Sequence, residues 1–176
     1  MTAPAARARV DTAFHRMVVG RFCSGVTIIT GVNGPPGRSR PAGFTCQSFA
    51  SLSLDPPLVI FTVGRSSRSW PDIRRSGAFC VNILASGQEG LCRVFAVSGA
   101  DKFAGIDWEP SPVTGSPRLP GSLAWIDCTI EAEHPGGDHY IAVGRVQALD
   151  VALPSSRPLL FYASGLHELP AGGQLI

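Results

Sequence analysis

The chain has 176 residues, of which 16% are charged and 44% are hydrophobic. This composition excludes a wholly disordered chain, and the length favours a single domain. The formal net charge of +2 is too small for a dedicated nucleic-acid-binding protein. Lys102 is the only lysine, so an anionic ligand would meet mainly arginine side chains. The planar guanidinium group of arginine binds phosphate through two parallel hydrogen bonds.

Neither a membrane span nor an export signal is predicted near the start of the chain. The longest apolar run there, residues 17–19, is far shorter than the roughly 20 residues that cross a bilayer. Residues 1–10 lack the apolar middle of a signal peptide. The five cysteines contain no Cys-x-x-Cys pair and lie mostly in apolar runs, which indicates buried reduced thiols in a cytoplasmic protein.

The domain is expected to span residues 11–170, with residues 1–10 as a flexible leader and residues 171–176 as a tail. A helix capped by Asp11 is predicted to open the domain, because apolar residues follow at spacings of three to four. These residues are Phe14, Met17, Val18 and Phe22. The β-branched residues 26–30 predict a strand, which residues 38–45 continue as a hairpin.

The next predicted elements are irregular. Apolar residues alternate unevenly over residues 44–57, which predicts a bulged segment that exposes backbone donors. Residues 58–63 form an apolar run typical of a central strand. A short helix around Trp70 follows, capped by one of the two preceding serines at 66–67 and ended at Gly77.

The second half of the chain is predicted to be mostly hairpins. We expect strands at residues 79–84, 123–133, 140–151 and 159–162. A helix over residues 86–96 is expected to turn Leu91, Val94 and Phe95 inward. The loop that follows, up to residue 120, is expected to be pinned by Phe103, Ile106 and Trp108.

The tally is six or seven strands with two or three peripheral helices. Strand and helix do not alternate regularly, which disfavours a doubly wound parallel sheet. The fold class is therefore mainly β, an antiparallel, Greek-key-like barrel that is closed or split.

Several common kinds of active site are missing from the sequence. It contains neither a Gly-x-Ser-x-Gly elbow nor a His-Glu-x-x-His zinc motif, and no Gly-x-Gly-x-x-Gly or Walker loop. The four histidines share no metal-ligand spacing, so we expect no metal. A cysteine nucleophile at Cys46 stays open but has no histidine nearby in sequence.

Two polar segments suit a ligand. Residues 45–53 carry four hydroxyls and an amide among apolar residues, a pattern that can hold a neutral heterocycle. Residues 65–69 combine two arginines with three serines at a helix start, which suits a phosphate. A capped helix with solvated arginines explains the second segment equally well.

Motifs spread from Phe14 to Tyr162 resemble the flavin reductase family, the reductase components of two-component flavin monooxygenases. The motifs are residues 21–30, 43–59, 67–69, 77–84, 101–105, 137–139 and 158–162. The resemblance implies an FMN-binding split barrel and a homodimer. It also implies an NAD(P)H-dependent enzyme that reduces FMN or FAD by hydride transfer and supplies reduced flavin by diffusion to a partner monooxygenase. A flavin-binding carrier or sensor without turnover is the main alternative, and a ligand-free scaffold barrel is a third.

The same resemblance assigns site residues. Flavin would be bound by Gly43, Phe44, Thr45, Cys46, Gln47, Ser48, Thr62, Val63, Gly64, Arg68 and Ser69. Arg68 and Ser69 would hold its phosphate. His139 would lie over the ring as the catalytic residue, and Tyr162, Ala163 and Ser164 would join it in binding the nicotinamide substrate.

Structural alternatives remain for several of these residues. Thr45 and Ser48 can stabilise a bulge, Arg68 can pair with Asp72, His139 can be a turn residue, and Tyr162 can be core. The sequence also departs from the family in two places. After Tyr162 the family commonly has an Arg-Gly pair and then a second tyrosine, whereas this chain has residues 163–167. The family also usually has an arginine directly before the phenylalanine that is Phe95 here, whereas Arg93 stands one position earlier. We therefore expect a dinucleotide's adenylate or phosphate to be held weakly.

Overall fold

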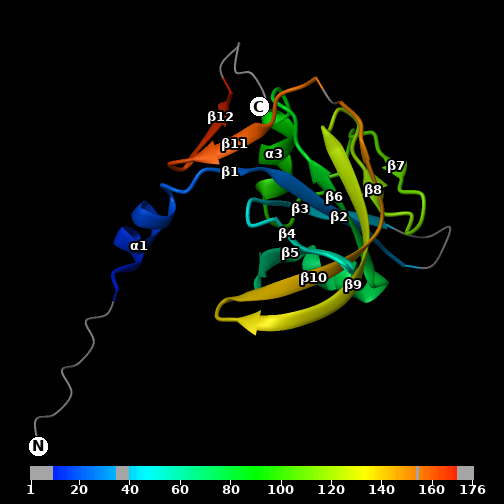
Figure 1. The fold of residues 1–176 in the computed structure, drawn as a ribbon, viewed down its shortest axis with the longest axis horizontal. Coiled ribbons are helices and arrows are strands. Elements are labelled where there is room, and N and C mark those ends of the chain that lie inside the picture. Colours follow the sequence, from blue (N-terminus) through cyan, green and yellow to red (C-terminus); the bar gives the residue numbers. More distant parts are fainter. Residues whose placement is uncertain (1–9, 35–39, 154, 170–176) are drawn as a thin grey trace, which may run out of the picture.

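The computed structural model describes residues 10–34, 40–153 and 155–169. The predicted tail lies outside these residues, as does the predicted leader except for Val10. One antiparallel sheet of seven strands dominates the fold and coils into a barrel (Figure 1). Its strands, in spatial order, are β3 (Arg40–Cys46), β2 (Thr27–Asn33), β6 (Ala78–Ile83), β9 (Ala124–Gly136), β10 (His139–Val151), β5 (Pro57–Gly64) and β4 (Ala50–Leu54).

Two small antiparallel sheets accompany the barrel. One joins β1 (Ser24–Gly25), β11 (Leu159–Tyr162) and β12 (Gly165–Glu168); the other joins β7 (Glu109–Pro110) and β8 (Pro117–Arg118). The three helices of the described residues are α1 (Thr12–Val19), α2 (Trp70–Ser76) and α3 (Glu89–Ala96). The predicted fold class, an antiparallel barrel with peripheral helices, agrees with this arrangement.

The barrel interior is filled by alternate residues of its strands. In β5 every second side chain is buried, beginning with Val59 and including Phe61 and Val63, as the two-residue period of a strand requires. Phe61 meets Phe79 and Trp70 edge to face, at centroid distances of 5.1 and 5.6 Å. Gly144 is required beside this cluster, because a β-carbon there would lie 2.2 Å from the Phe79 ring.

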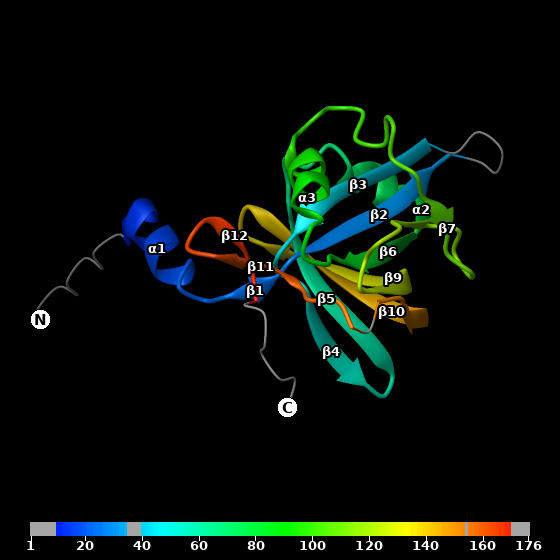
Figure 2. The same ribbon diagram turned by 90° about the horizontal axis from the view of Figure 1, so that it is seen from above.

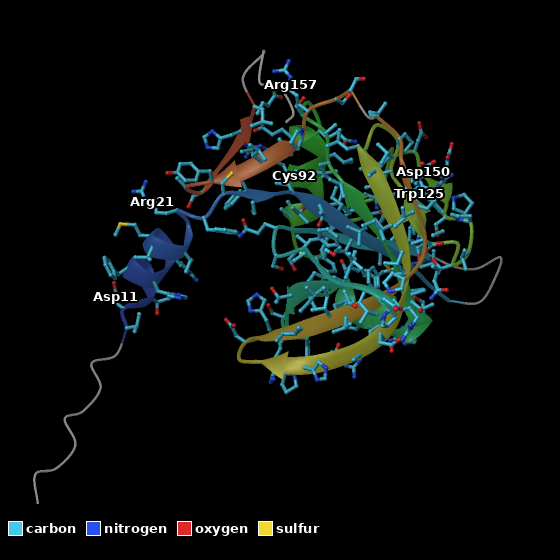
Figure 3. All side chains as sticks on the ribbon, in the orientation of Figure 1. Asp11, Arg21, Cys92, Trp125, Asp150 and Arg157 are labelled. Carbon is cyan, nitrogen blue, oxygen red and sulfur yellow. The ribbon has the colours of Figure 1, made fainter. Side chains whose placement is uncertain are left out.

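A second core lies between α3, β11 and the long loop that follows α3. Phe95 is fully buried there and packs edge to face on Phe103, which in turn meets Trp108. Cys92 of the same helix is buried in this cluster as well, and Figure 3 marks its position. The prediction that aromatic residues pin this loop is confirmed. The inward position predicted for Val94 is wrong, since it is 41% exposed: the short helix buries only Cys92 and Phe95.

Helix α1 begins after Asp11, as predicted, and the Asp11 carboxylate accepts hydrogen bonds from the backbone N–H groups of Ala13 and Phe14. The helix projects away from the barrel (Figure 2), and Figure 3 places Asp11 and Arg21 at its two ends, far from the sheet. None of its residues is buried. Its apolar face is therefore open to solvent in the single chain.

Candidate flavin site

A cavity of about 380 Å³ opens where the ends of β3 and β5 meet the start of α2, the end of α3 and the tip of the β9–β10 hairpin. A volume of this size lies within the range of small-molecule sites. Most of the residues predicted to bind flavin line this cavity. They are Phe44, Thr45, Cys46, Gln47, Ser48, Thr62, Val63, Gly64, Arg68 and Ser69, joined by His139.

The hydroxyl groups at one wall already have protein partners. Ser48 Oγ accepts from Thr62 N at 2.9 Å and from Thr62 Oγ1 at 2.8 Å, and it lies 3.2 Å from Thr62 O. Thr45 Oγ1 donates to the carbonyl of Cys92 on α3 at 2.6 Å. These side chains therefore hold the wall together, and a ligand would meet the backbone of the segment between β3 and β4.

Cys46 lines the cavity and also belongs to the buried cluster of the barrel core. Its Sγ lies 3.3 Å from Ser48 Oγ. Burial raises the pKa of the Cys46 thiol above its ordinary value. A nucleophilic cysteine needs a lowered thiol pKa, so this residue is unsuited to covalent catalysis.

Arg68 lies at the predicted phosphate end of the cavity. Arg68 makes no ion pair with a carboxylate among the residues that the structure describes. Asp72, its expected partner, instead pairs with Arg75 at 3.1 Å. The hydroxyl of Ser69 donates to the carbonyl of Gly43 at 2.7 Å, while Ser67 Oγ accepts from the backbone N–H of Trp70 at 3.2 Å.

Lys102 lies at the same end and was not assigned a role from the sequence. Its ammonium donates to Gly43 O at 3.0 Å and to Phe95 O at 2.9 Å. Burial lowers its pKa below the ordinary lysine value. The signals in the sequence were its status as the only lysine and its place in a family motif, residues 101–105. Gly43 itself does not line the cavity, but its carbonyl accepts hydrogen bonds from both Ser69 and Lys102.

His139 lies at the opposite wall of the cavity. It is the first residue of β10 and pairs with Gly64 of β5. Its Nδ1 is 2.7 Å from the Asp138 carboxylate, a hydrogen bond that lowers the pKa of Asp138. An ionised carboxylate only accepts hydrogen bonds, so Nδ1 carries the proton and donates it. The other ring nitrogen, Nε2, lies beside Gly64 at the cavity, 3.8 Å from where a β-carbon would stand.

The structure separates Tyr162, Ala163 and Ser164 from the residues above. Tyr162 ends β11, and Ala163 and Ser164 form the turn to β12, where they adopt positive φ angles of 48° and 65°. Ser164 lines a different cavity, of about 780 Å³, which shares Gln47 and Ser48 with the first. Of the residues predicted to bind nicotinamide, His139 therefore lines the 380 Å³ cavity, and Ser164 lines a cavity that adjoins it, whereas Tyr162 and Ala163 line neither.

The sequence profile of the Flavin reductase like domain matches residues 19–170. The chain belongs to this family. It is 54% identical over 153 residues to the reductase subunit HsaB of a flavin-dependent monooxygenase from Rhodococcus jostii, an alignment that covers 87% of this chain and 75% of HsaB. It is 43% identical to a flavin reductase of Pseudomonas putida, with 90% and 91% of the two chains covered.

Solved structures agree with this assignment to the flavin reductase family. Nitrilotriacetate monooxygenase component B from Mycobacterium thermoresistibile superposes with a TM-score of 0.87 at 48% identity, over 95% of this chain and 91% of that one. The NADH:FAD oxidoreductase SgcE6 of Streptomyces globisporus, solved with NAD and FAD fragments, gives 0.82 at 33% identity, over 93% and 96%. The predicted family, fold class and flavin reductase activity are confirmed.

Within the described part of the chain, no helix is both long and apolar enough to span a membrane. The same residues hold no group of three or more histidine, cysteine or acidic side chains placed to bind a metal ion.

Proposed function

We propose that this flavin reductase binds flavin in the 380 Å³ cavity, reduces it with NADH or NADPH, and releases it to a partner monooxygenase. The observation that carries the proposal is the convergence of unpaired Arg68, the backbone between β3 and β4, and His139 on one cavity. The HsaB relatives are named as subunits of flavin-dependent monooxygenases, which supports the release step.

The chemistry of the cavity fits a flavin. Flavin supplies hydride-accepting chemistry when bound, so the protein needs to orient two rings rather than to provide an acid–base pair. Residues 47–49 lie between β3 and β4 and outside the strand ladders, so their N–H groups face no strand partner. Such N–H groups stabilise negative charge that develops on a ring beside them.

The phosphate of the flavin would be held by Arg68. A guanidinium without a carboxylate partner is suited to a charge-assisted, bidentate contact with phosphate. Ser69 acts indirectly, because its hydroxyl is bonded to Gly43 O. Thr62, Val63 and Gly64 also line the cavity and would lie along the chain that joins the flavin ring to its phosphate.

His139 would orient the nicotinamide ring. The hydrogen bond from Nδ1 to Asp138 fixes the direction of the imidazole and leaves Nε2 beside Gly64. We assign Tyr162, Ala163 and Ser164 to the outer part of the nicotinamide site, since the cavity that Ser164 lines shares Gln47 and Ser48 with the flavin cavity.

We also infer a homodimer. Helix α1 exposes a row of large apolar side chains in the single chain, and a contiguous apolar surface of this kind marks an interface. The row comprises Phe14, Met17, Val18 and Val19, followed by Phe22, which is 81% exposed.

The cytoplasm is the compartment we propose, because five free cysteines, four of them buried, suit a reducing environment.

The test is flavin-dependent NADH oxidation by the purified protein. Arg68→Ala is expected to raise the KM for flavin about tenfold, the loss of one charge-assisted contact. Arg157→Ala is the control, since Arg157 does not line the cavity and its guanidinium instead donates to the carbonyl of Leu169 at 2.8 Å. An unchanged KM in Arg68→Ala would remove this residue from the site. Flavin binding without NADH or NADPH oxidation would instead indicate a carrier or sensor.

A further inference from the structure

The tip of the β9–β10 hairpin, which carries His139, is joined to the barrel by backbone hydrogen bonds at its edge. The backbone of His139 pairs with Gly64, the last residue of β5, and the N–H of Arg65 donates to the carbonyl of Asp138 at 3.0 Å. Residues 134–139 are all exposed, and the two long strands run together to the tip (Figure 1). A two-stranded ribbon is only marginally stable by itself. The position of His139 therefore also depends on contacts made elsewhere along the hairpin.

Glu133 makes such a contact, because it joins β9 to α2. Its carboxylate accepts a hydrogen bond from Trp70 Nε1 at 2.7 Å and pairs with Arg74 Nη1 at 3.4 Å. The side chain of Glu133 is only 15% exposed and Trp70 is buried. The hydrogen bond between them is therefore shielded from water, where such a bond is electrostatically stronger. Glu133 thus fastens the hairpin to two successive turns of α2.

Tyr140 makes a second contact with the same helix. The guanidinium carbons of Arg65 and Arg74 lie 5.1 and 6.0 Å from the centre of its ring, as in cation–π pairs. Successive residues of a strand point to opposite faces. Tyr140 accordingly lines a cavity with Trp70 and Arg74 of α2, whereas His139, its neighbour in β10, lines the flavin cavity. A displacement of Tyr140 from α2 would move His139 as well.

Helix α2 is in turn fixed to the candidate flavin site. Arg68 and Ser69 line the flavin cavity, and Trp70 directly follows them as the first residue of the helix. The ring of Trp70 packs edge to face on Phe44, another residue that lines the cavity, at a centroid distance of 6.4 Å. Trp70 is therefore a common point of attachment for the flavin cavity and for the hairpin that carries His139.

We propose that Glu133 is a positioning residue for the reduction of flavin: through Trp70 and Arg74 it sets where His139 lies relative to the flavin cavity. The inference rests on the proposed function, in which His139 orients the nicotinamide ring. Glu133 does not line the flavin cavity, so it acts through His139 and touches neither flavin nor NADH. Hydride transfer depends steeply on the relative placement of the two reacting rings. Loosening the hairpin therefore slows this step more than it weakens flavin binding.

Glu131 provides a matched control on the same strand. It lies two residues before Glu133 and pairs with Arg145 of β10 at 2.7 Å. Arg145 is paired with Leu58, near the start of β5, whereas the hairpin tip meets the other end of that strand. Removing this ion pair takes the same charge from the same hairpin but leaves its contact with α2 intact. A purely structural role of the hairpin's carboxylates would make the two positions equivalent.

The experiment measures the rate constant for reduction of bound flavin by NADH in an anaerobic stopped-flow instrument, alongside the equilibrium Kd for flavin. Glu133→Met is expected to lower the rate constant about fivefold and to leave the Kd within about twofold, because misplaced rings react more slowly. Glu133→Gln is expected to recover most of the rate, since its amide oxygen still accepts from Trp70 Nε1. Glu131→Met is expected to change neither quantity.

A double-mutant cycle separates positioning of His139 from a general loss of stability. In a His139→Gln protein, Glu133→Met is expected to lower the rate by less than about twofold, because residues that act through one another are not additive. Arg74→Met removes the ion pair at a side chain that is 57% exposed, so it leaves the core closed. It is expected to lower the rate about twofold, as loss of one partly exposed pair, and serves as the second variant if Glu133→Met does not fold.

Three results would overturn the assignment. They are a wild-type rate in Glu133→Met or, where that variant does not fold, in Arg74→Met, equal losses in Glu133→Met and Glu131→Met, and full additivity of Glu133→Met with His139→Gln. If His139→Gln by itself slows flavin reduction, each of these leaves the proposed function standing. A His139→Gln protein that reduces flavin at the wild-type rate would contradict the role of His139 in the proposed function, and this inference with it.

Discussion

Ser48 and Thr62 are joined by a group of short contacts that closes the barrel beside the candidate flavin site. The Ser48 hydroxyl meets the N–H, the hydroxyl and the carbonyl of Thr62 at 2.9, 2.8 and 3.2 Å. Ser48 follows β3 and Thr62 lies within β5, strands that are not neighbours in the sheet order. One side chain thus sets the spacing between the two walls of the cavity.

Ser48→Ala is expected to loosen this closure. It leaves the Thr62 N–H and hydroxyl without their partner at a partly exposed site, at a cost of about 1 kcal/mol in the free energy of unfolding. Flavin affinity is expected to fall more than the overall stability does, because the two walls of the cavity lose their link. Urea unfolding and flavin titration measure the two effects separately.

Ser51→Ala is a suitable control for that experiment, since Ser51 is exposed on β4 and does not line the flavin cavity. It is expected to leave flavin affinity unchanged. Equal losses of flavin affinity in both variants would show that Ser48 has no special part in the site.

Most of the barrel was predictable because its strands carry local signals. The β-branched run in β2 and the alternation in β9 are patterns that a sequence displays directly. Strand β12 was missed, because Gly165–Glu168 has no such pattern and becomes a strand only by pairing with β11. Residues 44–57 were predicted as a bulged segment, and β4 does have a register shift between Ser51 and Ser53 in its pairing with β5.

The residues of the candidate site could be predicted where they belong to contiguous sequence motifs. They could not be predicted where their position depends on contacts between residues far apart in the chain. Residues 44–48 and 62–64 line one cavity, as the family resemblance implied. Lys102 escaped assignment because a lysine is ordinarily solvated. Its burial arises from a contact with Gly43, 59 residues away in the chain, and no local pattern encodes such a contact.

Alkaline pH is expected to destabilise the protein through its buried thiols. Burial raises the pKa of Cys46, Cys80 and Cys92 above their ordinary value of 9.0, and raises the pKa of Cys128 to about 12. The stabilisation is complete below pH 9, where the thiols are protonated in both states. Between pH 9 and 12 the unfolded chain loses the Cys80 and Cys128 protons while the folded protein keeps them, so the free energy of unfolding falls with rising pH by about 1.4 kcal/mol per unit for each of these two thiols. Cys46 and Cys92 add to this fall until the pH reaches their own raised pKa.

Chemical denaturation between pH 8 and pH 11 measures this slope. Cys128→Ala is expected to make the decline shallower, because one titrating thiol is removed. Cys23 is the only cysteine that is exposed, and Cys23→Ser is expected to leave the slope as it is in the wild type. A free energy of unfolding that does not change across this range would contradict the assigned burial of the thiols.

His139→Gln is expected to reduce kcat/KM for NADH about tenfold while the Kd for flavin changes by less than about twofold. In the proposed function the imidazole orients the nicotinamide ring, and misplaced reactants react more slowly. Stopped-flow reduction of bound flavin separates the two quantities. A parallel rise in the flavin Kd would instead place His139 among the flavin contacts.

Asp138→Asn tests how His139 is held. The hydrogen bond from His139 lowers the pKa of Asp138, so the carboxylate stays ionised, and the pair intact, until the pH falls through that lowered value. An asparagine neither carries the charge nor requires the proton on Nδ1. Asp138→Asn is therefore expected to lower kcat/KM for NADH less than His139→Gln does. An effect as large as that of His139→Gln would mean that the carboxylate itself contributes directly.

The exposed face of α1 is expected to be covered by a second copy of the chain. Phe14 and Val18 lie one turn apart on this helix and are 57% and 51% exposed, so the double variant Phe14→Ser and Val18→Ser removes apolar surface without disturbing the barrel. Sedimentation equilibrium is expected to give twice the chain mass of 18.5 kDa for the wild type and 18.5 kDa for the variant. Val113→Ser, at a valine that is 61% exposed in a distant loop, is expected to remain dimeric. A wild-type protein that sediments as a single chain at micromolar concentration would contradict the homodimer.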